Sequence, residues 1–546
     1  MNENKPKGQE YVGWGLPHHR AHFGGLKPTL PLVCIVLLAT AGAFAQETGF
    51  KPIFDPGAPG LDGWKAPNMS YCSVEDGVIV GQSTQDNPVR SNQFLVWQAG
   101  QLDDFELKLK YRISGMDRAN SGIQIRSRVA PDGHVAGYQA DIDRAGRYAG
   151  ALYDERGRGM LAERGQKTVI GADGQKTHTA LGDAAALMNI INLDGWNEYH
   201  VIARGSRIIL KVNGEITADV QDNEKKNREL SGVLALQLHA GPPMKVEFKD
   251  IRLKRLKLTD RKKIVLIAGP RSHGHGSHEH NAGMLLLGKL LNENMPEVYA
   301  TTYLNGWPKD PTACDNADAI AVFCDGGGGH VVMRHLEEVD ALAKKGIGIA
   351  LLHSAVEVPK GRPGDYMLNW TGGYFETFWS VNPHWKAGFK ELPTHPITRG
   401  VRPFFMDDEW YYHMRFVDGM ENVTPILTAT PPDSTRRKGN DAHGANPHVR
   451  ARMGMPEHVG WAYDRPGGGR GFGFTGGHWH WSWASDDFRT LVLNALVWIA
   501  GVEVPTNGVP SKTPTVEELE ANQDYPVSKR WDRQKIQQMI AEWNRR

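Results

Sequence analysis

The first half of the chain alternates apolar and polar side chains in short runs. Residues 105–112 read FELKLKYR without a break, and this period of two is typical of a half-buried strand. Asn213-Gly214 predicts a hairpin turn, because both residues adopt positive φ readily. Further strands are expected at residues 123–126, 199–203, 208–212, 234–238 and 246–253. Many short strands without a long helical stripe predict an all-β jelly-roll sandwich over residues 50–256.

The second half has a different pattern. Residues 264–268 (IVLIA) form a continuous apolar run, which indicates a strand buried on both faces. Strands and helices then alternate, which predicts a mainly parallel sheet flanked by helices. The expected strands are 298–304, 319–324, 347–352, 459–463 and 471–475, and the expected helices are 282–291, 331–345 and 488–499.

These patterns predict a multidomain protein. The charged stretch 257–263 (KLTDRKK) separates the sandwich from an α/β flavodoxin-like, amidotransferase-like doubly wound domain at residues 263–505. A charged, partly helical tail at 506–546 has no assigned chemistry. Residues 1–45 resemble a bacterial signal peptide, since the apolar run 30–45 is short for a bilayer span and ends in Ala43-Phe44-Ala45. We expect cleavage after Ala45 and a periplasmic or secreted protein; an N-terminal membrane anchor is the alternative.

Composition and net charge limit the kinds of partner that the protein is expected to bind. Lys and Arg number 63 against 62 Asp and Glu, so net charge gives no reason to expect a nucleic-acid partner. We also expect no stable membrane span once the signal is removed. Beyond Cys34 only three cysteines remain, which cannot form a disulfide framework.

Histidines and carboxylates follow the predicted strands of the α/β domain. Ligands of such sheets bind outside the carboxyl ends of the strands. There the chain carries a histidine-rich loop at 273–280, His353, the group Asp407-Asp408-Glu409, and His478. Imidazoles and carboxylates that converge from different loops can bind a metal or move protons. A solvated loop and structural histidines are the alternative interpretation.

These residues lie within motifs that resemble the trehalose-utilisation (ThuA-like) family of the class I glutamine-amidotransferase fold. The resemblance implies that His353, Glu409 and His478 line a catalytic pocket. Because the expected nucleophile turn carries His353-Ser354, we expect Cys324 to be a buried structural thiol without glutaminase activity. The matching motifs are GIGIALLH (346–353), GGYF (372–375), HPITRG (395–400), DEWY (408–411), GGH (476–478) and VWIAGVEVP (497–505).

The sandwich carries a second series of candidates. Strand alternation predicts that Gln124 and Arg126 share one face, and that Gln139 and Asp141 point together. With Tyr153 and His239 nearby, this polar face suits a sugar, although ordinary solvent-facing alternation would look the same. The motifs resemble the 3-keto-disaccharide hydrolase family, a concanavalin-like jelly roll that acts on 3-keto-glycosides: NSGIQIR (120–126), GYQAD (137–141), GALY (150–153), WNEY (196–199), VNG (212–214) and LQLH (236–239). Gln139 stands where that family has an acidic residue.

A ketone at C3 acidifies the C2 hydrogen of a sugar, so a base can form an enolate that expels the C1 substituent before water adds. Asp141 or His239 is the candidate base and Arg126 the candidate enolate stabiliser. The binding candidates are Gln124, Arg126, Gln139 and Tyr153. No cofactor is fixed by the sequence, but a divalent metal ion is compatible with these residues.

The leading hypothesis is an exported enzyme that cleaves 3-keto-disaccharides and related 3-keto-glycosides, with the ThuA-like domain assisting in keto-sugar metabolism. Its expected partner is a small-molecule 3-keto sugar. One alternative is a carbohydrate-binding protein without turnover. Another places catalysis in the ThuA-like domain and makes the sandwich a binding module.

Overall fold

The computed structural model describes residues 48–439, 444–529 and 531–545. The expected signal peptide at residues 1–45 lies outside these residues. Among the described helices, none is both long enough and apolar enough to cross a bilayer.

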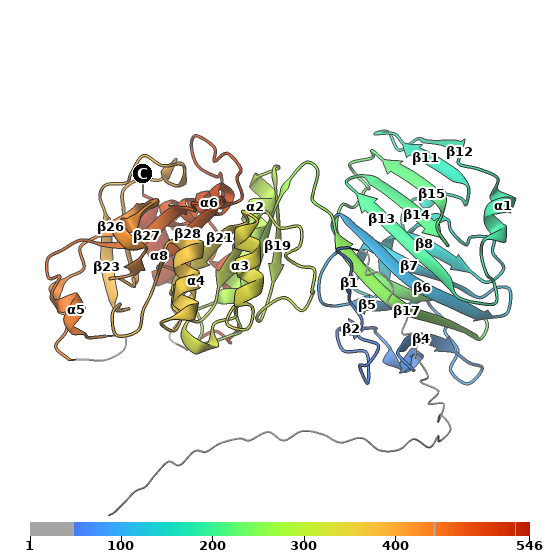
Figure 1. Cartoon of the computed structure of the whole chain (residues 1–546), viewed down its shortest axis with the longest axis horizontal. Helices are drawn as coiled ribbons and strands as arrows, with labels where there is room; N and C mark the ends of the chain where they lie inside the picture. Colours follow the sequence, from blue (N-terminus) through green and yellow to red (C-terminus); the bar gives the residue numbers. More distant parts are fainter. Residues whose placement is uncertain (1–47, 440–443, 530, 546) are drawn as a thin grey trace, which may run out of the picture. The chain divides into compact units, whose positions relative to one another are not determined.

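The first half of the chain forms two β-sheets (Figure 1). The larger sheet has the order β12-β11-β15-β14-β13-β6-β17-β4-β3, with β1 beside β17. Its strands are β1 (Lys51–Pro52), β3 (Cys72–Glu75), β4 (Val78–Ser83), β6 (Phe105–Gly115), β11 (Gln166–Ile170), β12 (Lys176–Ala180), β13 (Asn197–Arg204), β14 (Arg207–Val212), β15 (Glu215–Asp222) and β17 (Met244–Arg255). The short helix α1 spans Ala184–Asn189.

The smaller sheet of the sandwich carries the candidate sugar-binding residues. Its order is β10-β9-β8-β7-β16-β5-β2, with every neighbouring pair antiparallel. The strands are β2 (Trp64–Lys65), β5 (Gln93–Trp97), β7 (Asn120–Val129), β8 (Val135–Asp143), β9 (Leu152–Glu155), β10 (Gly159–Ala162) and β16 (Val233–Leu238).

Strand alternation explains how these sheets pack. Leu107 and Tyr199 of the larger sheet share one buried cluster with Ile123 and Leu236 of the smaller sheet. Every second residue therefore enters the core, and the other face of the smaller sheet is left for polar side chains. The predicted hairpin is confirmed: Asn213 and Gly214 have φ of 50° and 93° between β14 and β15. The jelly-roll sandwich predicted from the sequence is thus confirmed.

The second half builds a mixed seven-stranded sheet, β19-β18-β20-β21-β28-β27-β26. The first five of these strands run parallel, and β27 and β26 are antiparallel additions. The strands are β18 (Lys262–Ala268), β19 (Val298–Tyr303), β20 (Ala319–Phe323), β21 (Gly348–Leu352), β26 (Val423–Ala429), β27 (Glu457–Asp464) and β28 (Arg470–Phe474).

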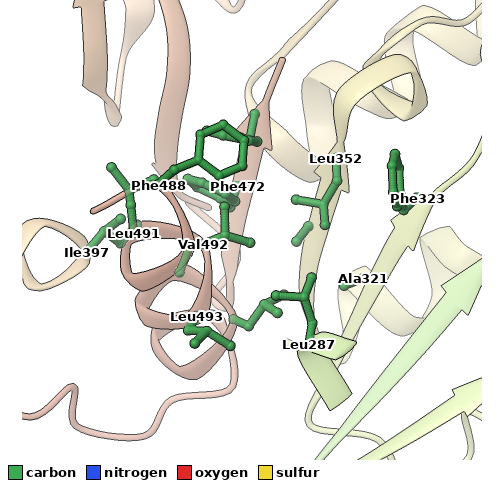
Figure 2. Packing of buried hydrophobic residues seen from close by; sticks show 14 of the residues in the cluster. Leu287, Ala321, Phe323, Leu352, Ile397, Phe472, Phe488, Leu491, Val492 and Leu493 are labelled. Carbon is green, nitrogen blue, oxygen red and sulfur yellow. The ribbon is translucent and has the colours of Figure 1, made fainter. Parts of the chain in front are cut away.

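Helices cover both faces of this sheet. Alternate residues of the central strands enter two separate apolar clusters, one with α2 (His280–Asn294) and α6 (Asp486–Ile499), the other with α3 (Leu336–Lys344) and α4 (Arg362–Thr371). Figure 2 shows Phe488, Leu491 and Val492 of α6 beside Phe472 of β28. The doubly wound α/β fold is confirmed.

Some elements differ from the prediction. The helix expected at residues 331–345 begins only at Leu336, because residues 331–334 form turns after His330, whose ring accepts from the Val332 amide. The sequence pattern also missed the hairpin of β23 (His384–Phe389) and β24 (Phe404–Glu409), the short pair β22 (Gly373–Tyr374) and β25 (Arg415–Phe416), and α5 (Pro447–Arg450). The tail is partly helical as expected, in α7 (Val516–Glu520) and α8 (Arg533–Trp543).

Candidate functional sites

Three imidazoles and one carboxylate converge at the carboxyl edge of the α/β sheet. His278 lies in the loop between β18 and α2, His353 directly follows β21, His478 lies after β28, and Glu409 ends β24. The Nε2 atom of His278 lies 3.0 Å from His478 Nδ1 and 3.1 Å from His353 Nε2. Glu409 Oε2 lies 3.0 Å from His478 Nδ1 and 3.4 Å from His353 Nε2. These four side chains form the histidine cluster.

Neighbouring acceptors fix the tautomers of two of these rings. His353 Nδ1 lies 2.7 Å from the carbonyl oxygen of Thr475, which can only accept a hydrogen bond. His278 Nδ1 lies 2.7 Å from a carboxylate oxygen of Asp325. Both Nδ1 atoms therefore donate, and in the neutral rings the Nε2 atoms carry lone pairs that face each other.

The backbone holds this cluster in an unusual conformation. His278 and His353 both have positive φ, 49° and 52°, which is uncommon for residues other than glycine. Such strain concentrates at functional sites. Asp408 fixes the two remaining members, because its buried carboxylate accepts from the amides of Glu409, Gly477 and His478.

Burial and neighbouring rings shift the ionisation of the cluster. Burial lowers the pKa of His353 to about 3, so this ring is neutral. Burial opposes ionisation of Glu409, but the three imidazoles hold the pKa of its carboxyl far below the usual range. Burial opposes the charged form of His278, but its contacts with Asp325 and Glu409 raise the pKa of this ring. The cluster places one carboxylate and three imidazoles around one point, a donor set that divalent transition metals bind when the ring nitrogens are deprotonated.

One side of the cluster reaches solvent. Asp325 is 41% exposed, and the exposed ring of His273 stacks on His278 with centroids 3.6 Å apart. His384 is exposed and meets His478 edge-on. Solvent-exposed residues thus border the cluster on this side.

The structure brings His353, Glu409 and His478 together, as the sequence interpretation requires. Their catalytic role stays a prediction. His278 belongs with them, although the sequence offered it only as one histidine of a rich loop. Asp325 was missed altogether. The signal for Asp325 was its position two residues after β20, which ends at Phe323, since carboxyl ends of neighbouring parallel strands share one edge.

Cys324 is a fully buried thiol, and burial raises its pKa to about 12. A thiolate nucleophile is therefore not formed there near neutral pH. This buried environment agrees with the expectation that Cys324 is a structural thiol.

A second polar group occupies the smaller sheet of the sandwich, on the face away from the core. Strand register places Tyr153, Gln139 and Gln124 side by side in one row. In the next row Asp141 and Gln237 flank Gly122, which has no side chain. A Cβ at Gly122 would lie 2.5 Å from the Gln139 side chain, so glycine lets Gln139 lie flat across the row. Asp141, Gln139, Gln124 and Gln237 form the sandwich polar face.

Hydrogen bonds of this face run in one direction. Ser127 donates to Gln124 at 2.7 Å, Gln124 donates to Gln139 at 2.6 Å, and Gln139 donates to Asp141 at 2.7 Å. The prediction that Gln139 and Asp141 point together is confirmed. The chain of donors ends at a single carboxylate, so Asp141 is its final acceptor.

Asp141 is almost fully buried, and burial raises its pKa to about 7. Donation from Gln139 opposes the shift, whereas the charges of Glu155 and Asp143 add to it. A carboxyl that titrates near neutrality can take up and release a proton at working pH. Asp141 therefore has the properties of a general base.

Arg126 departs from the prediction. The strand has an irregularity between Ile125 and Arg128, and Arg126 has a φ of 46°, so strict alternation stops there. The buried guanidinium instead pairs with Asp104 at 2.7 Å and donates to the carbonyl oxygens of Asp103 and Gly205. The expected shared face with Gln124 is wrong, and these partners assign Arg126 a structural role in place of substrate binding or enolate stabilisation.

The remaining candidates lie at the rim. Tyr153 is half-buried opposite Gln139. His239 follows β16, where its Nδ1 lies 2.6 Å from the Ala240 carbonyl oxygen, and no hydrogen bond among the described residues joins it to Asp141. Sequence reasoning missed Gln237, whose two amide atoms are buried and lack a hydrogen-bond partner among the described residues. Its signal was the polar residue within the apolar run 234–238.

Each half of the chain matches a different family model. The family model described as a 3-keto-alpha-glucoside-1,2-lyase-like domain matches residues 49–254. The model of the trehalose-utilisation family, ThuA, matches residues 265–499. The resemblance to both families is thereby confirmed.

Solved structures match each half separately. A proposed glycosyl hydrolase from Parabacteroides distasonis shares 18% identity over 38% of this chain and 94% of its own, with a TM-score of 0.25. A carbohydrate-binding module, CBM66, from Bacillus subtilis shares 16% over 35% and 95%, with a TM-score of 0.24. A proposed ThuA-like protein from Bacteroides uniformis shares 12% over 45% and 94%, with a TM-score of 0.31. No curated protein matches the chain.

Proposed function

We propose that the β-sandwich cleaves 3-keto-glycosides, including 3-keto-disaccharides, by elimination and hydration, with Asp141 as the base. The observation that carries this proposal is the position of Asp141, a buried carboxyl with a pKa of about 7 at the end of a directed donor chain. The match of residues 49–254 to a 3-keto-glucoside lyase-like domain supports the substrate class.

The reaction begins with proton transfer from C2 of the sugar to the carboxylate of Asp141. The electron pair of the C2–H bond moves into a C2–C3 double bond, and the C3 carbonyl oxygen becomes an enolate. Collapse of the enolate restores the carbonyl and breaks the bond between C1 and the glycosidic oxygen, which leaves as the alcohol after taking up the proton from Asp141, so that Asp141 returns to the carboxylate. Water then adds across the C1–C2 double bond, its oxygen to C1 and a proton to C2.

The enolate oxygen needs a donor, and Gln237 supplies one. Its amide nitrogen is buried, has no hydrogen-bond partner among the residues that the structure describes, and lies in the row that also holds Asp141. An unpaired buried donor costs free energy in the resting protein, and that donor is available to charge that develops on a bound substrate. Tyr153, half-buried in the neighbouring row, lies where it can contact the sugar ring.

Asp141→Asn tests the base directly. General-base catalysis contributes about 10²–10⁴-fold, so we expect turnover of a 3-keto-glucoside to fall by about 1,000-fold with KM little changed. Asp194→Asn is the matched control, because that carboxylate is exposed and its pair with Arg144 lies on the surface; it should retain wild-type turnover.

Full activity in Asp141→Asn would show that another group removes the proton, and His239 is the next candidate. Saturable binding of 3-keto sugars by the wild type without any product would support a carbohydrate-binding protein instead. Equal turnover of unoxidised glycosides would remove the need for the ketone and contradict the proposal.

Export is part of the same proposal and rests on the amino-acid pattern of residues 1–45. Expression in a bacterial host followed by fractionation should give a periplasmic or secreted protein whose N-terminal residue is Gln46. A protein that retains Met1 in the cytoplasm would contradict it.

A further inference from the structure

We propose that the histidine cluster of the α/β domain binds one divalent transition-metal ion, with His278 Nε2, His353 Nε2, His478 Nδ1 and Glu409 Oε2 as the protein ligands. These four atoms all lie within 4.8 Å of one another. The proposal concerns a different region from Asp141 and does not depend on the reaction assigned to the sandwich.

The orientation of the rings is the main argument. His278 and His353 each donate through Nδ1 to a group that accepts, so their Nε2 lone pairs meet at 3.1 Å. Two lone pairs at that separation repel each other unless a cation or a proton lies between them. A proton can serve one pair of atoms at a time, whereas a single ion satisfies all four donor atoms together.

The spacing of the donors fits one ion. Ligand atoms bound to the same metal at ~2.1 Å are separated by roughly 3.0–3.4 Å when they are neighbours. The separations in the structure are 3.0 Å for His278 to His478, 3.1 Å for His278 to His353, 3.0 Å for His478 to Glu409 and 3.4 Å for His353 to Glu409. His278 to Glu409 is longer, at 3.8 Å.

The donor set selects the type of metal. Three imidazole nitrogens and one carboxylate oxygen suit zinc, cobalt, nickel, iron or manganese, whereas magnesium and calcium prefer oxygen ligands. We therefore expect Zn²⁺ and Co²⁺ to bind and Mg²⁺ to bind far more weakly.

The surrounding residues support a metal site. Asp325 and the Thr475 carbonyl orient two ligand rings, and Asn382 donates to the second carboxylate oxygen of Glu409 at 3.0 Å. Asp408 fixes the backbone of Glu409 and His478. Partners of this kind hold ligands in place and are typical of metal centres.

The exposed side of the cluster offers room for a further ligand. Because His273, Asp325 and His384 are solvent-accessible there, we expect the ion to accept a carbonyl or hydroxyl oxygen from a small molecule as an additional ligand. The site would then act as a Lewis acid.

Metal analysis of the full-length protein tests the proposal. The protein is stripped with a chelator, dialysed and titrated with Zn²⁺, and the bound metal is counted by mass spectrometry. We expect one ion per chain, and His478→Ala should retain almost none at equal free metal. His384→Ala is the matched control, since this exposed histidine contacts His478 without offering a ligand atom to the cluster; it should still bind one ion.

Cobalt provides a second readout for variants that lose stability. Co²⁺ bound to the wild type should give visible absorption bands that Glu409→Gln, a conservative replacement, shifts or removes. Asp325→Asn should keep the same bands but weaken affinity by about 10–100-fold. A wild type that binds no Zn²⁺ and gives no cobalt spectrum, or a His478→Ala variant that binds as well as wild type, would overturn the proposal.

Discussion

The sandwich polar face and the histidine cluster contain similar polar side chains but orient them in opposite ways. On the sandwich face the donors of Ser127, Gln124 and Gln139 each meet an acceptor, in a series that ends at Asp141. In the cluster the Nε2 atoms of His278 and His353 face each other at 3.1 Å, while both Nδ1 atoms donate elsewhere. The first arrangement supports a single carboxyl that exchanges a proton, and the second supports a cation.

The two groups also differ in what holds them. Register between antiparallel strands places the sandwich residues in rows, whereas the cluster is assembled from strand ends and loops. Rows of a sheet place residues with little strain, but the cluster requires positive φ at two ligands. Strain of this kind is found most often at functional sites.

The largest expected effect is that of replacing Arg126, a substitution that distinguishes a structural role of this residue from a catalytic one. Arg126→Ala leaves Asp104 buried without its partner, so the free energy of unfolding should fall by about 3–5 kcal/mol in denaturant titration. Arg128→Ala is the control, because its ion pair with Glu229 is exposed and should matter little. A stable Arg126→Ala protein that has lost turnover would restore the catalytic assignment.

Gln237→Leu tests whether the unpaired amide acts as the enolate donor. Loss of one such donor costs about 100-fold in kcat, while stability should hold or rise because an unsatisfied buried amide disappears. Steady-state kinetics and thermal melting measure the two effects. Gln82→Leu, an exposed change on β4, provides the comparison. If both variants have wild-type kcat, Gln237 is not the donor.

Ionisation of buried Asp141 should lower the free energy of unfolding at the pH where this carboxylate is expected to act as the base. Its pKa is about 7 in the folded chain and near 3.8 in the unfolded chain, so between these values the folded state binds the extra proton. Stability therefore falls as pH rises through this window. Asp141→Asn removes the cost and should be more stable than wild type by about 2–4 kcal/mol at pH 8, with no gain at pH 3.5. An equal difference at both pH values would contradict the raised pKa.

The smallest expected effect is on the sandwich when the cluster loses its metal. Because the two groups are separate, chelator-treated protein should cleave 3-keto-glycosides within about twofold of the reloaded protein. Complete loss on chelation, with recovery on adding Zn²⁺, would instead place catalysis in the ThuA-like domain.

Sequence periodicity predicted the two folds well, because each depends on a repeated pattern. Phe105 to Arg112 shows which residues of β6 are buried, and the apolar run at 264–268 indicates a central parallel strand. The pattern failed at Arg126. A strand irregularity there breaks the alternation of side chains between the two faces of the sheet, and no Gly or Pro in the sequence signals it. It also missed the hairpin that carries Glu409.

The residues of the candidate sites were harder to predict from the sequence than the fold. Strand-end reasoning found His353 and His478, since both follow central strands. It could not choose His278 from the four histidines of residues 273–280, nor find Asp325, because loop conformation decides which side chains converge. Raised pKa values such as that of Asp141 depend on burial by residues distant in sequence.

The most direct test of the account is cleavage of a 3-keto-glucoside in D₂O, with the isotope content of the released 3-keto sugar read by NMR. Proton removal at C2 and later hydration predict deuterium at C2 of the product, formed faster than free product exchanges under the same conditions. A product that keeps its original hydrogen at C2 would show that the glycosidic bond breaks without an enolate, and would contradict the role of Asp141.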